Sequence, residues 1–187
     1  GILDTDPTMP VTLGNLVTAD AEVDGRLDDV RVETVARTAS WLAAAESNQR
    51  APGSFLSVGG ATTGTWFDQG TWTARKAIAV DADLVAADVN DFTLLVQTID
   101  PDMQAAALAD GSDIVFTDAD GLTRLDHVIE SYDSGTGALS AWVSIPTLSS
   151  VSDTELFVYY GTPAAVDQQD SVAVFGPDAD LAFLGDS

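Results

Sequence analysis

The chain of 187 residues contains no cysteine, a single histidine and a single lysine. Without cysteine it can form neither a disulfide nor a thiolate metal site. A Ser-His-Asp triad or a histidine metal centre would have to be built around His127 alone, and we interpret His127 as a packing or rim residue. Gly59 and Gly60 are not followed by the Gly-Lys-Ser/Thr of a phosphate-binding loop. The sequence therefore indicates neither a catalytic nor a nucleotide site, and we expect a protein that is not an enzyme.

Basic residues are also scarce, since 30 Asp and Glu stand against 7 Lys and Arg, for a formal net charge of -23. Such a surface repels nucleic acid and anionic membranes. Salt relieves the self-repulsion, because the Debye length falls from about 10 Å at 0.1 M to about 3 Å at 1 M. We therefore expect an extracellular, marine or hypersaline protein; the alternative is a merely soluble acidic surface.

Long apolar runs are absent as well, and no stretch approaches the roughly 18 residues that span a bilayer. We expect no membrane insertion. Because residue 1 is glycine and not methionine, we also expect a processed product or a part of something longer.

What the sequence does contain is a series of short β-branched and aromatic runs separated by Gly, Asp, Asn and Pro. Several alternate between apolar and polar residues, as half-buried strands do. This spacing predicts an all-β fold, an antiparallel, jelly-roll-like β-sandwich. The runs are residues 27–32, 76–80, 92–97, 114–117, 125–131, 138–145 and 155–160.

Two short helices are predicted, and we expect both to close the ends of sheets. Thr38 or Ser40 can cap the run WLAAAESNQ, which Asn48 and Pro52 end. The second helix is predicted over residues 103–109, after the acidic Asp-Pro-Asp at 100–102.

Periodicity lapses in the Gly- and Thr-rich residues 59–66, where we place a domain boundary. The chain then divides into a small N-terminal module (1–60), a larger sandwich (61–174) and a C-terminal extension (175–187). The extension ends on the apolar Leu181, Ala182, Phe183 and Leu184.

The pattern Asp-Ala-Asp occurs three times, and its copy at Asp118 and Asp120 is followed by Gly121. Hard oxygen ligands that converge at a turn suit Ca²⁺, so calcium is a candidate cofactor at Asp118 and Asp120. No Glu stands at the twelfth position that a calcium loop would need. A solvated β-turn is the competing interpretation.

Seven Trp and Tyr residues could stack on sugar rings, but such residues more often fill a sandwich core, and we favour the core. They are Trp41, Trp66, Trp72, Trp142, Tyr132, Tyr159 and Tyr160.

Residues 72–174 resemble the domain of unknown function 2341, which occurs in large bacterial and archaeal surface or secreted proteins, commonly beside LamG modules. The matching stretches are Trp72 with Arg75-Lys76, then DFTLLVQ, GSDIVFTDADG, HVIESYD, AWVSIP and ELFVYYGTPAA.

The flanking segments resemble parts of a concanavalin-like LamG module. Residues 25–59 are similar to its closing segment, with a final strand, a turn, a Trp-bearing helix and a Ser-Phe strand, and residues 179–187 are similar to its opening strand. The resemblance thus implies a smaller, incomplete concanavalin-like β module at the N-terminus.

In a concanavalin-like sandwich the opening and closing strands are neighbours, so a second copy could complete each half. We therefore expect a structural subunit that assembles head-to-tail with copies of itself by β-strand complementation. The assembly interface would hold Leu181, Ala182, Phe183 and Leu184 against Leu27, Val30 and Val32. The alternative is an adhesion or carbohydrate-binding module of a longer surface protein, with glycans as partners and possible dependence on calcium.

Overall fold

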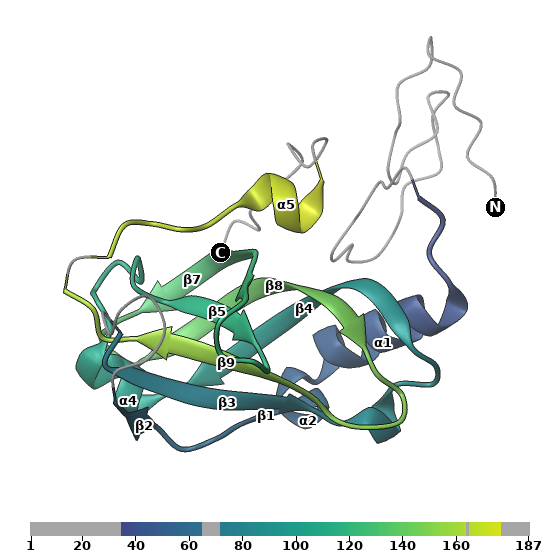
Figure 1. Ribbon diagram of the computed structural model, residues 1–187, viewed down its shortest axis with the longest axis horizontal. Coiled ribbons are helices and arrows are strands. Elements are labelled where there is room, and N and C mark those ends of the chain that lie inside the picture. Colours follow the sequence, from purple (N-terminus) through teal and green to yellow (C-terminus); the bar gives the residue numbers. More distant parts are fainter. Residues whose placement is uncertain (1–34, 65–71, 164, 177–187) are drawn as a thin grey trace, which may run out of the picture. The chain divides into compact units, whose positions relative to one another are not determined.

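The computed structural model describes residues 35–64, 72–163 and 165–176 (Figure 1). The described helices and strands all belong to one unit, Ala36–Ser187. Several predicted features lie outside the described residues: the strand at 27–32 with Leu27, Val30 and Val32, the aromatic residue Trp66, and the C-terminal residues Leu181, Ala182, Phe183 and Leu184.

Two antiparallel sheets form the described part of the fold, which confirms the predicted all-β sandwich (Figure 1). The six-stranded sheet has the order β1 (Leu56–Val58), β3 (Ala74–Val80), β9 (Thr154–Tyr160), β5 (Val115–Asp118) and β6 (Arg124–Leu125), with β2 (Thr62–Thr63) also paired to β3. The three-stranded sheet has the order β4 (Val89–Ile99), β8 (Ala138–Leu148) and β7 (His127–Asp133).

The core lies between the two sheets and follows the alternation that the sequence predicts. Because successive side chains of a strand point to opposite faces, every second residue of β3 is buried. From β9, Leu156 and Val158 point inward, and Phe92 and Leu94 of β4 meet them from the other sheet. All four are at most 1% exposed. Burial of such side chains contributes about 1.5–3 kcal/mol each.

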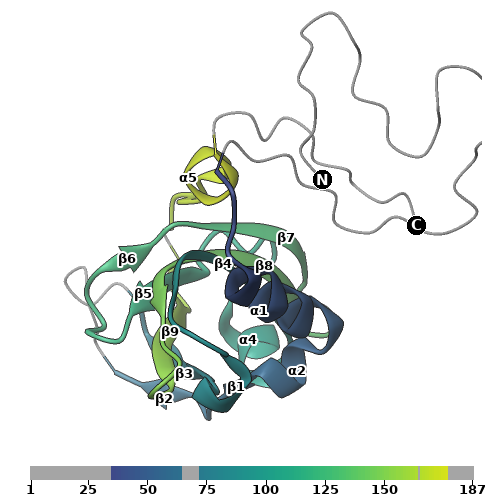
Figure 2. The same ribbon diagram turned by 90° about the vertical axis from the view of Figure 1, so that its right-hand side faces the viewer.

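Helix α1 (Ala39–Arg50) begins where predicted, since the Thr38 side chain accepts a hydrogen bond from the backbone N–H of Trp41. The short helix α2 (Pro52–Phe55) follows at once, with Pro52 in its first turn. Trp41 and Phe55 both pack on Phe92, at ring-centroid distances of 5.6 and 6.3 Å. The two helices therefore cover the open side of the sandwich between β4 and β1 (Figure 2), whereas α1 was predicted to close an end.

Among the described residues, three further short helices follow: the 3-10 turn η1 (Ala82–Leu84), α4 (Pro101–Ala106) and α5 (Ser171–Phe175). Helix α4 lies at one end of the sandwich, as predicted (Figure 1). It starts earlier than the predicted 103–109, because Asp100 is its N-cap and Pro101 opens its first turn. It ends at Ala106 because Ala107 is extended and the backbone N–H of Leu108 turns to the carboxylate of Asp113.

The compact unit starts at Ala36, which differs from the predicted division near residue 60. Residues 36–60 belong to the larger unit for two reasons. Strand β1 pairs with Ile78–Val80 of β3, and Trp41 and Phe55 are part of the sandwich core. Ser54 and Phe55, expected in a strand, lie in α2, and the strand begins at Leu56. Within the Gly- and Thr-rich stretch, β2 also pairs with β3.

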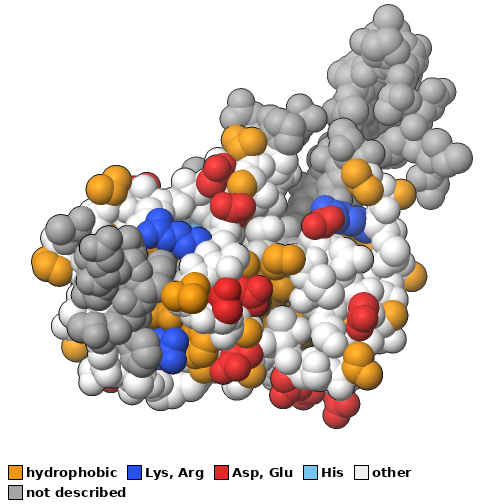
Figure 3. All heavy atoms as spheres, viewed as in Figure 1, with side chains coloured by type: hydrophobic (Ala, Val, Ile, Leu, Met, Phe, Trp, Pro, Cys, Tyr) orange, Lys and Arg blue, Asp and Glu red, His pale blue; other side chains and the backbone are white. Residues whose placement is uncertain are grey.

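Acidic side chains outnumber basic ones on the surface that Figure 3 shows. On the face shown in Figure 3, acidic side chains are scattered and basic side chains gather at few places. In the part of the chain that the structure describes, no helix is long and apolar enough to cross a membrane.

Candidate functional site

The candidate calcium ligands Asp118 and Asp120 lie at the turn between β5 and β6. The Asp120 carboxylate accepts hydrogen bonds from the backbone N–H groups of Leu122 and Thr123, both at 2.8 Å, and from the Thr123 hydroxyl at 2.7 Å. Hydrogen bonds from the hydroxyl and backbone of Thr123 and from Leu122 lower the pKa of Asp120. Asp118 accepts from the N–H of Ala119. The pair therefore has the geometry of a hydrogen-bonded turn.

Across the described residues, no group of three or more His, Asp or Glu side chains converges as a metal site would require. Calcium at Asp118 and Asp120 stays a prediction that the described geometry does not support.

His127 is a packing residue, as predicted. Its side chain is buried, its ring meets Phe116 edge-on with centroids 5.3 Å apart, and Nδ1 lies 3.2 Å from the carbonyl oxygen of Leu125. The other ring nitrogen, Nε2, is buried and has no hydrogen-bond partner among the described residues. Burial lowers the pKa of His127, against the opposing effect of nearby carbonyls and of the charges of Asp167 and Asp126. The neutral imidazole is therefore the stable form inside the fold.

Two of the aromatic residues, Trp41 and Tyr160, lie in the sandwich core, as predicted. Trp72 and Tyr159 are equally buried, at most 2% exposed, but form a separate cluster with Val115 on the outer face of the six-stranded sheet. Trp142 and Tyr132 are half-buried, and the prediction for Trp66 lies outside the described residues.

Two arginines stack on aromatic rings of the outer face of the six-stranded sheet. The Arg75 guanidinium lies 4.1 Å from the ring centroid of Phe157 and donates a hydrogen bond to the Tyr159 hydroxyl at 3.0 Å. Arg124 lies 5.6 Å from the ring of Trp72. Guanidinium groups prefer such contacts because the face of an aromatic ring is negative.

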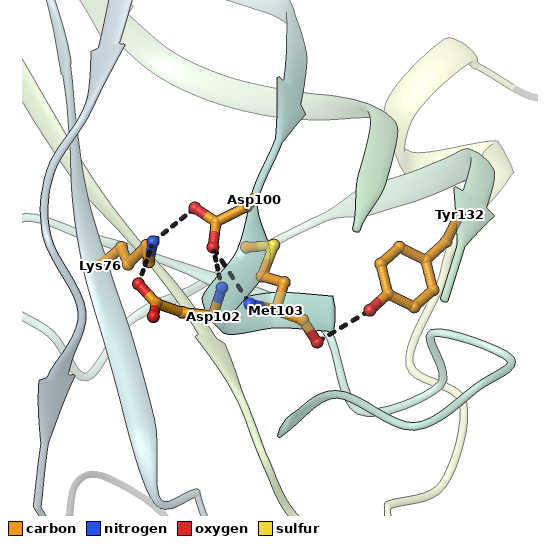
Figure 4. A network of polar contacts seen from close by, with 5 residues as sticks. All are labelled: Lys76, Asp100, Asp102, Met103 and Tyr132. Carbon is orange, nitrogen blue, oxygen red and sulfur yellow. Dashed lines mark hydrogen bonds and ion pairs between the residues drawn. The ribbon is translucent and has the colours of Figure 1, made fainter. Parts of the chain in front are cut away.

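A polar centre that sequence reasoning missed lies inside the sandwich, where the chain's single lysine meets two carboxylates (Figure 4). Lys76 shares the inward face of β3 with Ile78, and its side chain is 5% exposed. Its Nζ contacts Oδ2 of Asp100, whose side chain is 6% exposed, and lies 2.8 Å from Oδ2 of Asp102. The sequence could have predicted the burial of Lys76. In the strand ARKAIAV, Lys76 alternates with the apolar Ile78 and Val80, so all three side chains point to the same face.

Asp100 is held on its other side by the backbone. Its Oδ1 accepts hydrogen bonds from the N–H groups of Asp102 and Met103, at 2.9 and 3.0 Å. The carbonyl of Met103 in turn accepts from the hydroxyl of Tyr132 at 2.9 Å (Figure 4). Both oxygens of the Asp100 carboxylate therefore have hydrogen-bonding partners.

Opposing effects act on the charge of this centre. Burial alone would lower the pKa of Lys76, but the hydrogen bonds and charges of Asp100 and Asp102 outweigh it and raise that pKa. Tyr160 lies close enough to feel the same charges: burial first, and then Asp100 and Asp102, raise the pKa of its phenol. Its hydroxyl is buried and has no hydrogen-bond partner. The resting state of the centre is thus an ion pair beside a neutral phenol.

A second buried carboxylate, Asp113, was also not identified from the sequence. It is 0% exposed, and its two oxygens accept from the backbone N–H groups of Leu108 at 2.8 Å, Gly161 at 2.7 Å and Thr162 at 3.2 Å. Asp113 thereby ties the loop after α4 to the end of β9. Its role is to hold backbone.

A shallow depression of about 440 Å³ crosses the three-stranded sheet and is lined by Gln97, Ile99 and Ser140, among others. The Gln97 amide donates to the Ser140 hydroxyl at 3.4 Å, and that hydroxyl donates to the Glu130 carboxylate at 2.9 Å. This row of polar groups, with the exposed Ile99 beside it, could contact a small polar ligand.

Comparison with known proteins supports part of the resemblance seen in the sequence. Residues 110–177 match the family model of the Domain of unknown function (DUF2341), which covers the chain from just before β5 to α5. The resemblance to this family is therefore confirmed over that segment, while the LamG-like flanks remain a resemblance. Neither the curated proteins nor the solved structures contain a match.

Proposed function

We propose that the chain is a non-enzymatic, extracellular structural subunit that assembles head-to-tail with copies of itself, through β-strand complementation by its terminal segments. The observation that supports this proposal is that groups of the same chain already occupy both edges of the three-stranded sheet. A copy cannot easily add a strand there, so a joint between copies falls to other segments.

The edge at β4 is occupied by α1. The side-chain amide of Asn48 donates to the carbonyl of Leu95 at 2.9 Å and accepts from its N–H at 2.7 Å. The edge at β7 is bound by the segment before α5, where the N–H of Asp170 donates to the carbonyl of His127 and the Gln169 side chain accepts from the N–H of Ile129.

The described edges of the six-stranded sheet are short. Strand β6 has two residues, and β1 and β2 have three and two. Short edges provide few main-chain hydrogen bonds to an incoming strand. A strand from a second copy would therefore bind weakly at each described sheet edge. This supports assigning assembly to residues 25–32 and 179–187.

The energetics require more than the four apolar residues. Burying Leu181 and Phe183 contributes about 1.5–3 kcal/mol each. Ordering four residues costs roughly 1–2 kcal/mol apiece for the backbone. These terms nearly cancel, so a lasting joint needs additional contacts from the preceding residues. Because such a joint is heterologous, its repetition gives a ring or an open fibre.

A matched pair of truncations tests the proposal. Deletion of residues 179–187 removes the proposed donor strand, whereas deletion of 185–187 keeps Leu181–Leu184 in place. We expect both variants to fold with the same circular dichroism spectrum, and only the longer deletion to abolish assemblies in light scattering and electron microscopy. Assemblies of normal size from the longer deletion would refute strand complementation by this segment.

The depression on the three-stranded sheet favours a second candidate, an adhesion or carbohydrate-binding module. Gln97 and Ser140 line the depression, and together with the Glu130 carboxylate that accepts from Ser140 they offer both donors and acceptors to sugar hydroxyls. This candidate predicts that the monomer binds glycans on an array. The Gln97→Ala variant should bind less, whereas the control Thr147→Ala, on the same sheet, should bind as the wild type does. Repeating the array with and without calcium tests the predicted dependence on that ion.

A further inference from the structure

The contact between Lys76 and Asp100 joins the two sheets of the sandwich. Lys76 belongs to β3 of the six-stranded sheet, and Asp100 directly follows β4 of the three-stranded sheet. The two residues are 24 positions apart, and Nζ contacts the carboxylate oxygen Oδ2 directly. A covalent bond between these side chains would cross-link the two layers of the fold.

Lys76, Asp100 and Asp102 together have the parts that amide formation requires. We propose that Lys76 and Asp100 condense into an intramolecular amide bond, with Asp102 carrying the protons, so that the folded protein is cross-linked between its sheets. This inference is independent of the proposed assembly.

Burial makes the condensation feasible. In water an amine and a carboxylic acid stay ionised, and water opposes a reaction that releases water. Here both side chains are at most 6% exposed, so the protein keeps bulk water away from the ion pair and from the water that the reaction releases. Holding the two groups in contact also replaces a bimolecular encounter by a reaction within one site, which can be worth an effective molarity of about 10⁵–10⁸ M.

The surrounding groups have defined roles in the step. Oδ1 of Asp100 accepts two backbone hydrogen bonds, from Asp102 and Met103, which stabilise the negative charge that this oxygen gains when the amine attacks. Oδ2 faces Lys76 and is the oxygen that leaves. Asp102 lies 2.8 Å from Nζ and its side chain is 55% exposed, so it can accept a proton from nitrogen and exchange with solvent.

The atoms balance without any other reactant. Asp102 takes a proton from the Lys76 ammonium and passes it to Oδ2 of Asp100. The nitrogen lone pair then attacks Cγ of Asp100, and a second proton moves from nitrogen through Asp102 to Oδ2. The bond from Cγ to Oδ2 breaks and one water molecule leaves. The product is an amide between Nζ and Cγ, and Asp102 is regenerated as a carboxylate.

Intact mass spectrometry of the denatured full chain tests the proposal. We expect the chain to be lighter than its sequence mass by one water molecule. The Lys76→Arg variant and the Asp102→Asn variant should both show the full sequence mass. The matched control Asp83→Asn, in the exposed turn η1, should keep the water loss. A wild-type chain at its full sequence mass would overturn the proposal, and water loss in Asp102→Asn would overturn the role of Asp102.

Digestion with trypsin locates the bond. Trypsin should leave the bond after Lys76 intact, and release residues 76–124 as one looped peptide that lacks one water molecule. Cyclisation of an aspartate before glycine, such as Asp110 or Asp120, also removes water. It leaves Lys76 open to trypsin and persists in Lys76→Arg, so either of these results would overturn the amide.

Discussion

The side chain of Asn48 hydrogen-bonds to both backbone groups of Leu95, donating from Nδ2 to the carbonyl at 2.9 Å and accepting at Oδ1 from the N–H at 2.7 Å. The two residues are 47 positions apart, one in α1 and one in the edge strand β4. Asn48 is 0% exposed, so water cannot replace it. One amide side chain thus closes a sheet edge as a neighbouring strand would.

Replacing Asn48 by alanine should destabilise the domain by about 2–4 kcal/mol, because it leaves a buried N–H and a buried carbonyl of Leu95 without partners. Urea denaturation measures the change. The control Glu46→Ala, which breaks an exposed ion pair with Arg50 on the same helix, should cost at most about 0.5 kcal/mol. Equal losses for the two variants would show that the edge contact contributes nothing specific.

Replacing Asp113 by asparagine should be nearly as harmful as replacing it by alanine. Both carboxylate oxygens accept backbone hydrogen bonds, so an amide nitrogen must face either Leu108 or the pair Gly161 and Thr162. We expect a loss of about 2–4 kcal/mol in thermal or urea unfolding. A loss below about 1 kcal/mol for Asp113→Asn would contradict this account of the carboxylate.

Stability should fall as the pH drops below about 6.5, the ordinary pKa of histidine. Burial lowers the pKa of His127 in the folded state, so the unfolded chain binds a proton that the folded chain does not. The contribution of His127 is fully present above pH 6.5 and is lost towards lower pH, with a slope of up to about 1.4 kcal/mol per pH unit.

The comparison of the wild type with His127→Gln between pH 5.5 and 7.5 isolates this contribution from that of the carboxylates, which titrate lower. In the variant, the free energy of unfolding should no longer fall with decreasing pH over this range, whatever its absolute value. Parallel pH profiles for the two proteins would exclude His127 as the cause.

Salt should stabilise the chain. Its net charge of -23 produces repulsion within each molecule and between copies, and raising the ionic strength from 0.1 to 1 M shortens the Debye length to about 3 Å. We expect the midpoint of thermal unfolding to rise over this range with sodium chloride. A midpoint that falls or stays constant would contradict the interpretation of the acidic surface as an adaptation to saline surroundings.

The sequence predicted what depends on neighbours along the chain. The β-branched and aromatic runs predicted strands at 76–80 and 155–160, where β3 and β9 lie, and Thr38 was one of the two caps predicted for α1. The sequence could not predict pairs that only the packing of distant elements brings together. The contact of Asn48 with Leu95 depends on which helix lies at which sheet edge.

The meeting of Lys76 with Asp100 likewise depends on how the two sheets face each other. Asp100 was identified only as part of a helix start, and its partner lies on the opposite sheet. The same reason explains the domain boundary. The glycine-rich stretch ends the local pattern, but α1 and β1 pack into the core beyond it, and local periodicity carries no information on that packing.

The central claim is that copies of this chain join through their terminal segments, and particle size measured beside intact mass tests it most directly. Light scattering after size-exclusion chromatography at 1 M sodium chloride, on a chain with the verified mass of 19.5 kDa, should show assemblies many times that mass. The variant lacking residues 179–187 should elute as a folded monomer. A wild-type chain that stays monomeric at every salt and protein concentration would contradict the account.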